Sequence, residues 1–378
     1  DIMQFYDKCI KNDEKERPII SQLIIEFYIR YCSRIQICNF FELYEQYLSN
    51  YYDNDTINRM KKFYHDENDP EIQYQIGILY KNGKVVPYDI QKALLYLNNA
   101  ADKNHPMAQF TMGLLYYEGK GVKKCFNQAK KFFELSANQN NAEALDYLGN
   151  IYYKGENVEK NYEKAFQYFE LSARQDNPDA LCKIGYFYEN GYSCRKDFHK
   201  AKDFYEKSAK QDYPLALNYL GMIFIQGTGI AIDHKKGVQY LEQAEKLNSP
   251  EACVNLGYFY NFQSKNLDYS KGRYYYEKAI QLGSITAFLY MGNLYFFGVG
   301  VQQNFLQAKE WYEKAAEHDD ADAFNVIGHL YNTGKGVAVN YTKAKEYFEK
   351  AVKKDHPNAC NSLGNIYLYG NGIAPDYY

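Results

Sequence analysis

Glycine recurs along this chain with a period of 36 residues, and this period constrains the fold more than any other feature. Successive glycines are 36 residues apart, except that Gly257 and Gly292 are 35 apart. A fixed period over most of a chain indicates one repeated supersecondary unit and not a set of unrelated globular domains. The period glycines are Gly77, Gly113, Gly149, Gly185, Gly221, Gly257, Gly292, Gly328 and Gly364.

The residues around each glycine follow a helical pattern. An aromatic residue stands three positions after it (position +3), as in Tyr116, and alanine stands five positions before it (−5) at every glycine but the first. Residues three or four apart share one face of a helix, so the pattern predicts a buried stripe on a helix of about twelve residues. A proline such as Pro106 precedes many of these segments, and a loop such as Gly119–Gly121 follows. We name this segment helix A.

A second apolar pattern follows each glycine loop and predicts a helix B. It runs from an alanine such as Ala129 through a ring such as Phe132 to a small residue such as Ala137, with helical and not strand spacing. A glycine inside a helix costs on the order of 1 kcal/mol relative to alanine. Its recurrence therefore predicts that helix B crosses helix A too closely for a Cβ atom.

The run Ala-x-x-x-Leu-Gly-x-x-Tyr-x-x-Gly-x-Gly-Val, followed by Lys-Ala-x-x-aromatic-aromatic-x-x-Ala-Ala, resembles the Sel-one-like repeat, a longer-looped relative of the tetratricopeptide repeat. The resemblance covers residues 71–378 and implies an all-α fold, a right-handed α/α superhelical solenoid of helix pairs. Eight repeats are complete, and a ninth reaches Tyr378 before its helix B. Since a solenoid needs a polar cap, we expect the natural chain to continue. Repeat six departs from the pattern, because residues 261–266 replace the glycine loop and Gly272 replaces the helix B alanine.

Residues 1–70 lack the period. Residues 35–70 keep helical spacing, which predicts a divergent capping repeat, and residues 1–34 are predicted to be a helical N-terminal segment. Cys9, Arg17 and Pro18 are spaced as in the closing motif of a protein kinase catalytic domain, Cys-Trp-x-x-Asp-Pro-x-x-Arg-Pro, whereas Ile10 and Glu14 depart from it. The alternative is a polar loop between two cap helices. The chain has no His-Arg-Asp, Asp-Phe-Gly or G-x-G-x-x-G motif, so a kinase domain would have to lie upstream.

Composition argues against several classes of partner and cofactor. The 44 Lys and Arg against 47 Asp and Glu leave a formal charge of −3, with no basic field for nucleic acid or an anionic membrane. No apolar run approaches the roughly 18 residues of a membrane span, so we expect no membrane insertion. The eight cysteines form no C-x-x-C pair, which favours a reducing, cytoplasmic setting without structural zinc. We expect no cofactor and no metal.

Three motifs that suggest chemistry are better explained as turns. The Gly-x-Gly loops lack the Gly-Lys-Ser/Thr of a phosphate-binding loop and recur at the A-to-B turns. Ser193 and Lys196 match the S-x-x-K of penicillin-recognising enzymes, but the K-T-G and S-D-N partners are missing. His105 and His356 each precede a boundary proline, and we expect them to be solvated turn residues and not metal ligands. The chain is therefore predicted not to be an enzyme.

The helix A positions that the core pattern leaves free predict a binding surface. In tetratricopeptide-like solenoids, positions −3, +1 and +4 of helix A form the concave wall. Asparagine both donates and accepts hydrogen bonds, so asparagines there can bond the main chain of an extended peptide; the alternative is that they only solubilise an Asn-rich chain. The predicted partner-binding residues are Asn293, Phe296, Asn325, His329, Asn332, Asn361, Asn365 and Leu368 towards the C-terminus and Tyr74, Phe110 and Tyr117 at the aromatic N-terminal end.

These observations predict a non-catalytic scaffold or adaptor that binds other proteins or peptides on the concave helix A surface. Two alternatives stay open. The chain could be the regulatory or substrate-recruiting tail of a signalling kinase, or a structural component of a large protein assembly.

Overall fold

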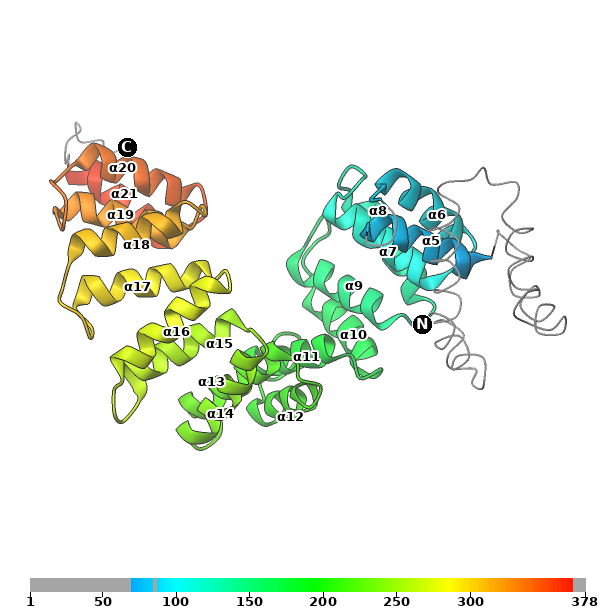
Figure 1. The fold of residues 1–378 in the computed structure, drawn as a ribbon, viewed down its shortest axis with the longest axis horizontal. Coiled ribbons are helices and arrows are strands. Elements are labelled where there is room, and N and C mark those ends of the chain that lie inside the picture. Colours follow the sequence, from blue (N-terminus) through cyan, green and yellow to red (C-terminus); the bar gives the residue numbers. More distant parts are fainter. Residues whose placement is uncertain (1–68, 84–86, 370–378) are drawn as a thin grey trace, which may run out of the picture. The chain divides into compact units, whose positions relative to one another are not determined.

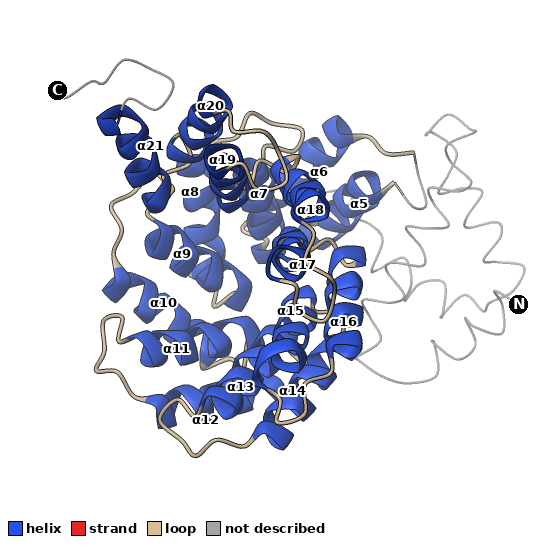
Figure 2. Cartoon of the chain, turned by 90° about the vertical axis from the view of Figure 1, so that its left-hand side faces the viewer, coloured by secondary structure: helices blue, strands red, loops and turns tan. Residues whose placement is uncertain are grey.

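The computed structural model describes residues 69–83 and 87–369, and within these residues every regular element is a helix (Figures 1 and 2). The predictions for the kinase-like segment and the capping repeat, residues 1–68, lie outside the described residues. The chain divides into two compact units, residues 1–180 (unit 1) and 181–378 (unit 2), and the boundary falls within one helix, α11 (Pro178–Asn190).

Helices A and B alternate in both units, as the sequence predicts. In unit 1, the A helices are α5 (Pro70–Asn82), α7 (Pro106–Glu118) and α9 (Ala142–Lys154), and the B helices are α6 (Ile90–Asp102), α8 (Phe126–Ala137) and α10 (Tyr162–Ala173). In unit 2, most of α11 is followed by the A helices α13 (Pro214–Gln226), α15 (Pro250–Tyr258), α17 (Ile285–Phe297), α19 (Ala321–Thr333) and α21 (Pro357–Tyr369). Its B helices are α12 (Phe198–Ala209), α14 (His234–Lys246), α16 (Tyr269–Gln281), α18 (Phe305–Ala316) and α20 (Tyr341–Val352). Within each unit a B helix packs on the A helices before and after it, which makes each unit an all-α repeat solenoid.

The ends of the A helices are fixed by local hydrogen bonds. A side chain eight residues before the period glycine accepts a bond from the backbone N–H of the −5 alanine. Ala144 N–H donates to Asn141 Oδ1 at 2.8 Å, and Ala323 N–H donates to Asp320 Oδ1 at 2.8 Å. This is the N-cap arrangement that satisfies one of the free N–H groups of a first turn. At the other end, Gly119 adopts φ 75° and its N–H bonds Leu115 O, so the glycine loop stops the helix.

Each period glycine lies against a side chain of the following helix B. A Cβ on Gly113 would stand 2.5 Å from Phe133 Cε1, and a Cβ on Gly328 would stand 2.6 Å from Phe348 Cε1. No real Cβ contact is that short, so the prediction of a close helix crossing at the glycine is confirmed. The exception is Gly364 of α21, where an added Cβ would meet no atom of the described residues within 4 Å.

The ring that fills the glycine position is not the helix B ring singled out by the sequence pattern. That ring, Phe132 in repeat two, stacks on the +3 tyrosine of helix A, Tyr116, with ring centroids 5.7 Å apart. The next residue, Phe133, is the one that packs on Gly113 and is fully buried. The same division of two neighbouring residues recurs in repeat eight, where Tyr347 stacks on Tyr331. Two adjacent helix B side chains therefore hold each helix pair together.

Repeat six, which departs from the sequence pattern, contains a π-helical turn, η3 (Phe259–Gln263), at the end of α15. The turn places Asn261 inside, 1% exposed, with its Nδ2 donating to Gly257 O at 2.8 Å. A Cβ on Gly272 would come within 2.4 Å of the Asn261 amide, so glycine replaces the helix B alanine there to leave room for this side chain. The turn itself was not predicted from the sequence.

Candidate functional site

The residues predicted to bind a partner at the N-terminal end lie in unit 1 and are partly or fully packed. Tyr74 stacks on His105 with centroids 4.7 Å apart, and Tyr117 meets Tyr147 edge to face at 5.7 Å. Phe110 is only 8% exposed and contacts Phe133 in the core. The expectation that Phe110 lines an open wall is therefore wrong, because position −3 faces the neighbouring helices and not solvent.

The asparagine-rich residues of the C-terminal end fall into two groups. Asn325, also at position −3, is 9% exposed, and its amide makes no hydrogen bond with any described residue, so its placement on an open wall is likewise corrected. Asn332 is half-buried and its Oδ1 also lacks a partner there. Of the remaining members of this set, the structure leaves His329, Asn361, Asn365 and Leu368 on the surface, and Asn293 and Phe296 half-buried.

Contacts across adjacent A helices bring together some of the predicted residues. The Nε2 of His329 in α19 lies 3.2 Å from the hydroxyl of Ser362 in α21, and its ring meets Phe348 edge to face at 5.0 Å. Partial burial lowers the pKa of His329, and the neighbouring His356 lowers it further. On α17, Asn293 accepts a bond from the buried Tyr312 hydroxyl at 2.7 Å.

Position −2 of helix A was missed by the sequence reasoning, although it provides much of the contact between adjacent A helices. Tyr219 packs on Tyr186 of the preceding A helix at 5.8 Å, and Tyr290 packs on Tyr258 at 6.1 Å. At the same position Asn255 donates to Asn218 at 2.8 Å. The signal in the sequence is that position −2 lies three residues from +1 and shares its helix face.

We define the A-helix wall as positions −2, +1 and +4 of repeats five to nine, on α13, α15 with η3, α17, α19 and α21. None of these positions holds Asp, Glu, Lys or Arg, although 24% of the chain is charged. Repeats one and four do place charges at the same positions, namely Lys81, Lys183 and Glu189. The A-helix wall therefore offers apolar rings and amides without a formal charge.

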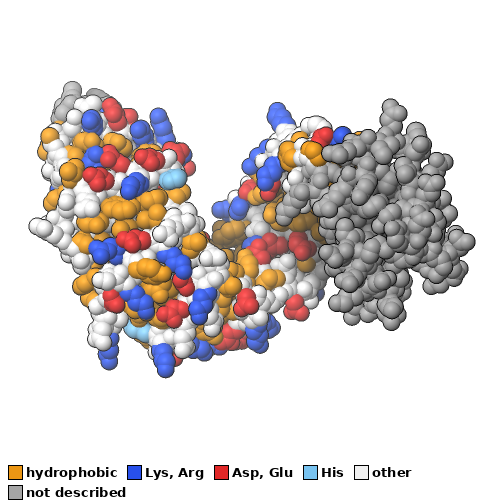
Figure 3. All heavy atoms as spheres, viewed as in Figure 1, with side chains coloured by type: hydrophobic (Ala, Val, Ile, Leu, Met, Phe, Trp, Pro, Cys, Tyr) orange, Lys and Arg blue, Asp and Glu red, His pale blue; other side chains and the backbone are white. Residues whose placement is uncertain are grey.

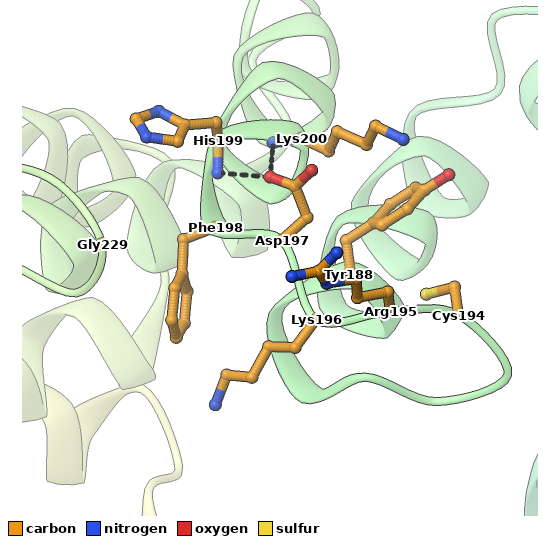
Figure 4. A pocket seen from close by; sticks show the side chains of 9 residues that line it. All are labelled: Tyr188, Cys194, Arg195, Lys196, Asp197, Phe198, His199, Lys200 and Gly229. Atoms are coloured by element: carbon orange, nitrogen blue, oxygen red, sulfur yellow. Dashed lines mark hydrogen bonds between the residues drawn. The ribbon is translucent and has the colours of Figure 1, made fainter.

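A basic hollow in repeat four is not a convincing anion site. Its lining includes Arg195, Lys196 and Lys200 around the start of α12, but the lysine side chains point apart (Figure 4). The carboxylate of Asp197 accepts from the backbone N–H groups of His199 at 3.1 Å and Lys200 at 3.0 Å. An acidic side chain thus already occupies the helix N-terminus, where an anionic ligand would otherwise bind.

The matched S-x-x-K residues beside this hollow lack the environment of a catalytic pair. Ser193 sits in an exposed turn with φ 55°, and the Lys196 ammonium lies 4.6 Å from the Phe198 ring centroid. The nearby Cys194 thiol has its pKa raised by burial, which is the opposite of what activates a thiolate. We assign this segment to the turn between helices.

The two boundary histidines are structural and not solvated, which corrects the expectation from the sequence. His105 Nδ1 accepts from Ala108 N–H at 3.1 Å, and its Nε2 lies 2.9 Å from a Glu71 carboxylate oxygen. Because Nδ1 accepts, the proton is on Nε2, which donates to Glu71 and lowers the pKa of that carboxyl. His356 repeats the arrangement with Asp322 at 2.8 Å. Each histidine joins the starts of two successive A helices.

Neither a metal-binding cluster nor a membrane-spanning helix is found in the part of the chain that the structure describes. No group of three or more His, Cys, Asp or Glu side chains is placed there to hold a metal ion. No helix there combines the length and the apolar character that a membrane span requires.

Comparison with protein-family models finds the Sel1 repeat in consecutive segments that together span nearly all of residues 70–378. The chain belongs to the Sel1 repeat family. Most of the Sel1 segments begin at the residue that opens an A helix, such as Pro106 and Ala142, whereas those of repeats seven and eight begin four residues later. The segment for repeat six, residues 250–284, is one residue shorter than those before it.

Solved structures with the Sel1 fold are similar to this chain. One is c5321, a protective antigen of uropathogenic Escherichia coli with an SLR fold, which is 25% identical with a TM-score of 0.56 over 82% of this chain and 67% of that one. Another is a Sel1 repeat protein from Oxalobacter formigenes, 25% identical, with a TM-score of 0.55 over 83% of this chain and 92% of that one. Yeast Tom70 shares the fold at 13% identity and a TM-score of 0.50, over 81% of this chain and 65% of that one. No curated protein matches the chain.

Sel1 repeats generally build non-catalytic scaffolds that bind proteins. The kinase-like segment, residues 1–34, lies outside the Sel1 match, and the link to a kinase stays a prediction.

Proposed function

We propose that this Sel1 repeat protein is a non-catalytic scaffold that binds a protein or peptide partner on the A-helix wall of unit 2. The observation that carries the proposal is that none of the exposed or half-buried wall positions of repeats five to nine carries a formal charge. A wall that only needed to be solvated would share the charge content of the rest of the surface, because charged side chains are the usual means of solubility.

Partial exposure of the wall supports the same proposal. Met222 is half-buried, and Tyr258, Asn365 and Leu368 are exposed, so a partner can reach apolar and amide groups together. Such a mixture of rings, Met and amides, with charges depleted, is the composition of the centre of a protein interface.

A site-specific cross-linking experiment tests the proposal in the full chain. A photoreactive amino acid is placed at Met222 or Asn365 on the A-helix wall, and at Glu310 or Glu346 on exposed faces of α18 and α20 as matched controls. We expect discrete cross-linked partner bands from the two wall positions and none from the two helix B positions. Equal labelling at all four positions, or labelling confined to helix B, would contradict the proposal and favour a role for the opposite face.

A further inference from the structure

Exposed aromatic rings are concentrated in repeats six and seven. Tyr258 is 37% exposed, Phe262 43% and Phe297 66%. Phe262 and Phe297 both stand five residues after their period glycines, where repeats one to five carry only polar residues. In unit 2, hydrophobic side chains gather over the region of α16 to α18 (Figure 3). Apolar side chains that cluster at a surface mark an interaction site more often than single ones do.

These rings form two connected groups on adjacent A helices. The rings of Tyr258 and Phe262 lie 5.1 Å apart at the π-helical turn, and Tyr290 of α17 meets Tyr258 at 6.1 Å. Tyr290, Asn293 and Phe297 are spaced by three and four residues and share one face of α17. We call Tyr258, Phe262, Tyr290, Asn293 and Phe297 the aromatic strip.

The π-helical turn explains why repeat six presents its rings. An extra residue in the last turn shifts the side chains that follow it, and π-bulges of this kind are frequent at functional sites. Here the turn buries Asn261 against Gly272, and Phe262, the next residue, is exposed. The pair Asn261 and Gly272 therefore fixes the orientation of Phe262.

The polar groups of the aromatic strip are hydrogen-bond donors without partners. The hydroxyls of Tyr258 and Tyr290 bond no described residue. Asn293 uses its Oδ1 to accept from the buried Tyr312 hydroxyl, so its Nδ2 is directed away from that bond and has no partner among the described residues. No wall position adds a formal charge, and the Lys335 ammonium lies 4.9 Å from the ring centroid of Phe296.

We propose that the aromatic strip binds a proline-rich segment in the polyproline II conformation, an inference that rests on the proposed function of the A-helix wall. Proline rings are flat and apolar and dock between aromatic side chains. A polyproline II chain has no internal hydrogen bonds, and its carbonyl groups are free to accept from Tyr258, Tyr290 and Asn293. A helical partner has its own carbonyls bonded internally and would leave these donors unsatisfied.

Direct binding of an oligoproline peptide tests the inference. The probe is a fluorescein-labelled oligoproline of about twelve residues, which spans roughly 37 Å at ~3.1 Å per residue. A Gly-Ser peptide of the same length is the control probe, and fluorescence anisotropy with the full chain is the measurement. We expect saturable binding of oligoproline only, with an affinity that changes less than about twofold when salt is raised, because no ion pair forms.

Variants locate the binding. Tyr258→Ala and Phe297→Ala should each weaken oligoproline binding by roughly tenfold or more, as removal of an aromatic anchor does. Tyr258→Phe keeps the ring and loses only the donor, so it should weaken binding by about threefold to tenfold. The matched control is Tyr274→Ala, which removes a ring that is 54% exposed on α16 outside the strip and should leave binding unchanged.

The inference is overturned if oligoproline fails to saturate, if the Gly-Ser peptide binds equally, or if Tyr274→Ala weakens binding as much as Tyr258→Ala. Sedimentation of the wild type and Tyr258→Ala adds a separate outcome. If the wild type self-associates and the variant does not, the strip is an interface between copies and the peptide proposal fails. The cross-linking experiment at Met222 and Asn365 does not use oligoproline. The proposed scaffold function can therefore be supported even if oligoproline does not bind.

Discussion

The side chain of Leu241 in α14 fills the space beside Gly221 in α13, where a Cβ would come within 2.6 Å of its Cγ and Cδ2. The backbone carbonyl of Gly237 lies only 3.0 Å from the same point. Both helices are buried at this crossing, and Leu241 itself has no exposed surface. A side chain on residue 221 would therefore have to push the two helices apart.

Substitution of Gly221 should destabilise unit 2. Gly221→Leu is expected to lower the free energy of unfolding by at least about 1 to 3 kcal/mol, the usual cost of overpacking a close contact. Gly364→Ala is the matched control, because its Cβ would meet no atom of residues 69–83 and 87–369 within 4 Å and alanine is the better helix former by roughly 1 kcal/mol. Urea denaturation measures both variants. An unchanged midpoint for Gly221→Leu would mean that the crossing is looser than the structure has it.

The unpaired amide of Asn325 predicts a stabilising substitution. Burial of a polar group without a hydrogen bond costs about 1 to 3 kcal/mol, so Asn325→Leu, of similar volume, should raise the free energy of unfolding or leave it unchanged. Asn293→Leu is the contrasting variant, because it leaves the buried Tyr312 hydroxyl without its acceptor and should destabilise by a similar amount. Thermal and urea unfolding test both. Equal losses of unfolding free energy in the two variants would show that the Asn325 amide has a hydrogen-bond partner.

The pair of His105 and Glu71 predicts an acid-dependent contribution to the stability of unit 1. The bond from His105 lowers the pKa of Glu71 below its ordinary 4.5, so the folded state favours the ionised carboxylate. This contribution is present above the pKa of the unfolded chain and is lost as the pH falls through the lower folded pKa. Glu71→Gln should therefore flatten the loss of stability in acid. Glu143→Gln is the control. Glu143 holds the same register in α9, but the residue that caps the following A helix is Asn177 and not a histidine. The prediction fails if both variants keep the wild-type slope.

Buried tyrosines predict a loss of stability in alkali. The Tyr205 hydroxyl donates to Glu189 at 2.6 Å, and burial, reinforced by that carboxylate, raises the pKa of Tyr205 far above its ordinary 10. Above pH 10 the unfolded chain ionises this tyrosine while the folded chain does not, so stability falls as the pH rises. Tyr205→Phe should reduce this slope, whereas Tyr274→Phe on the surface should not. Urea unfolding at several alkaline pH values measures the slope, and identical slopes would refute the assignment.

Particular residues show how far sequence reasoning reaches. The A and B helices, their breaks at glycine and proline, and the close crossing at Gly113 followed from spacing alone, because each is set within one 36-residue unit. Position −2 and the burial of Phe110 and Asn325 did not follow. These depend on how the neighbouring A helix is rotated about its axis and how closely it packs, which the sequence pattern of a single repeat does not predict.

The sequence by itself thus determined the repeated unit, since helical periodicity and the need to bury one stripe of each helix act over a few residues. Only the tertiary structure decided which of Phe132 and Phe133 packs against Gly113. It also decided that His105 forms a hydrogen bond with Glu71, which lies 34 residues earlier in the chain. It also decided that Asn261 enters the core through a π-helical turn. Each of these choices depends on side-chain packing between helices, where a rotation of one residue exchanges a buried group for an exposed one.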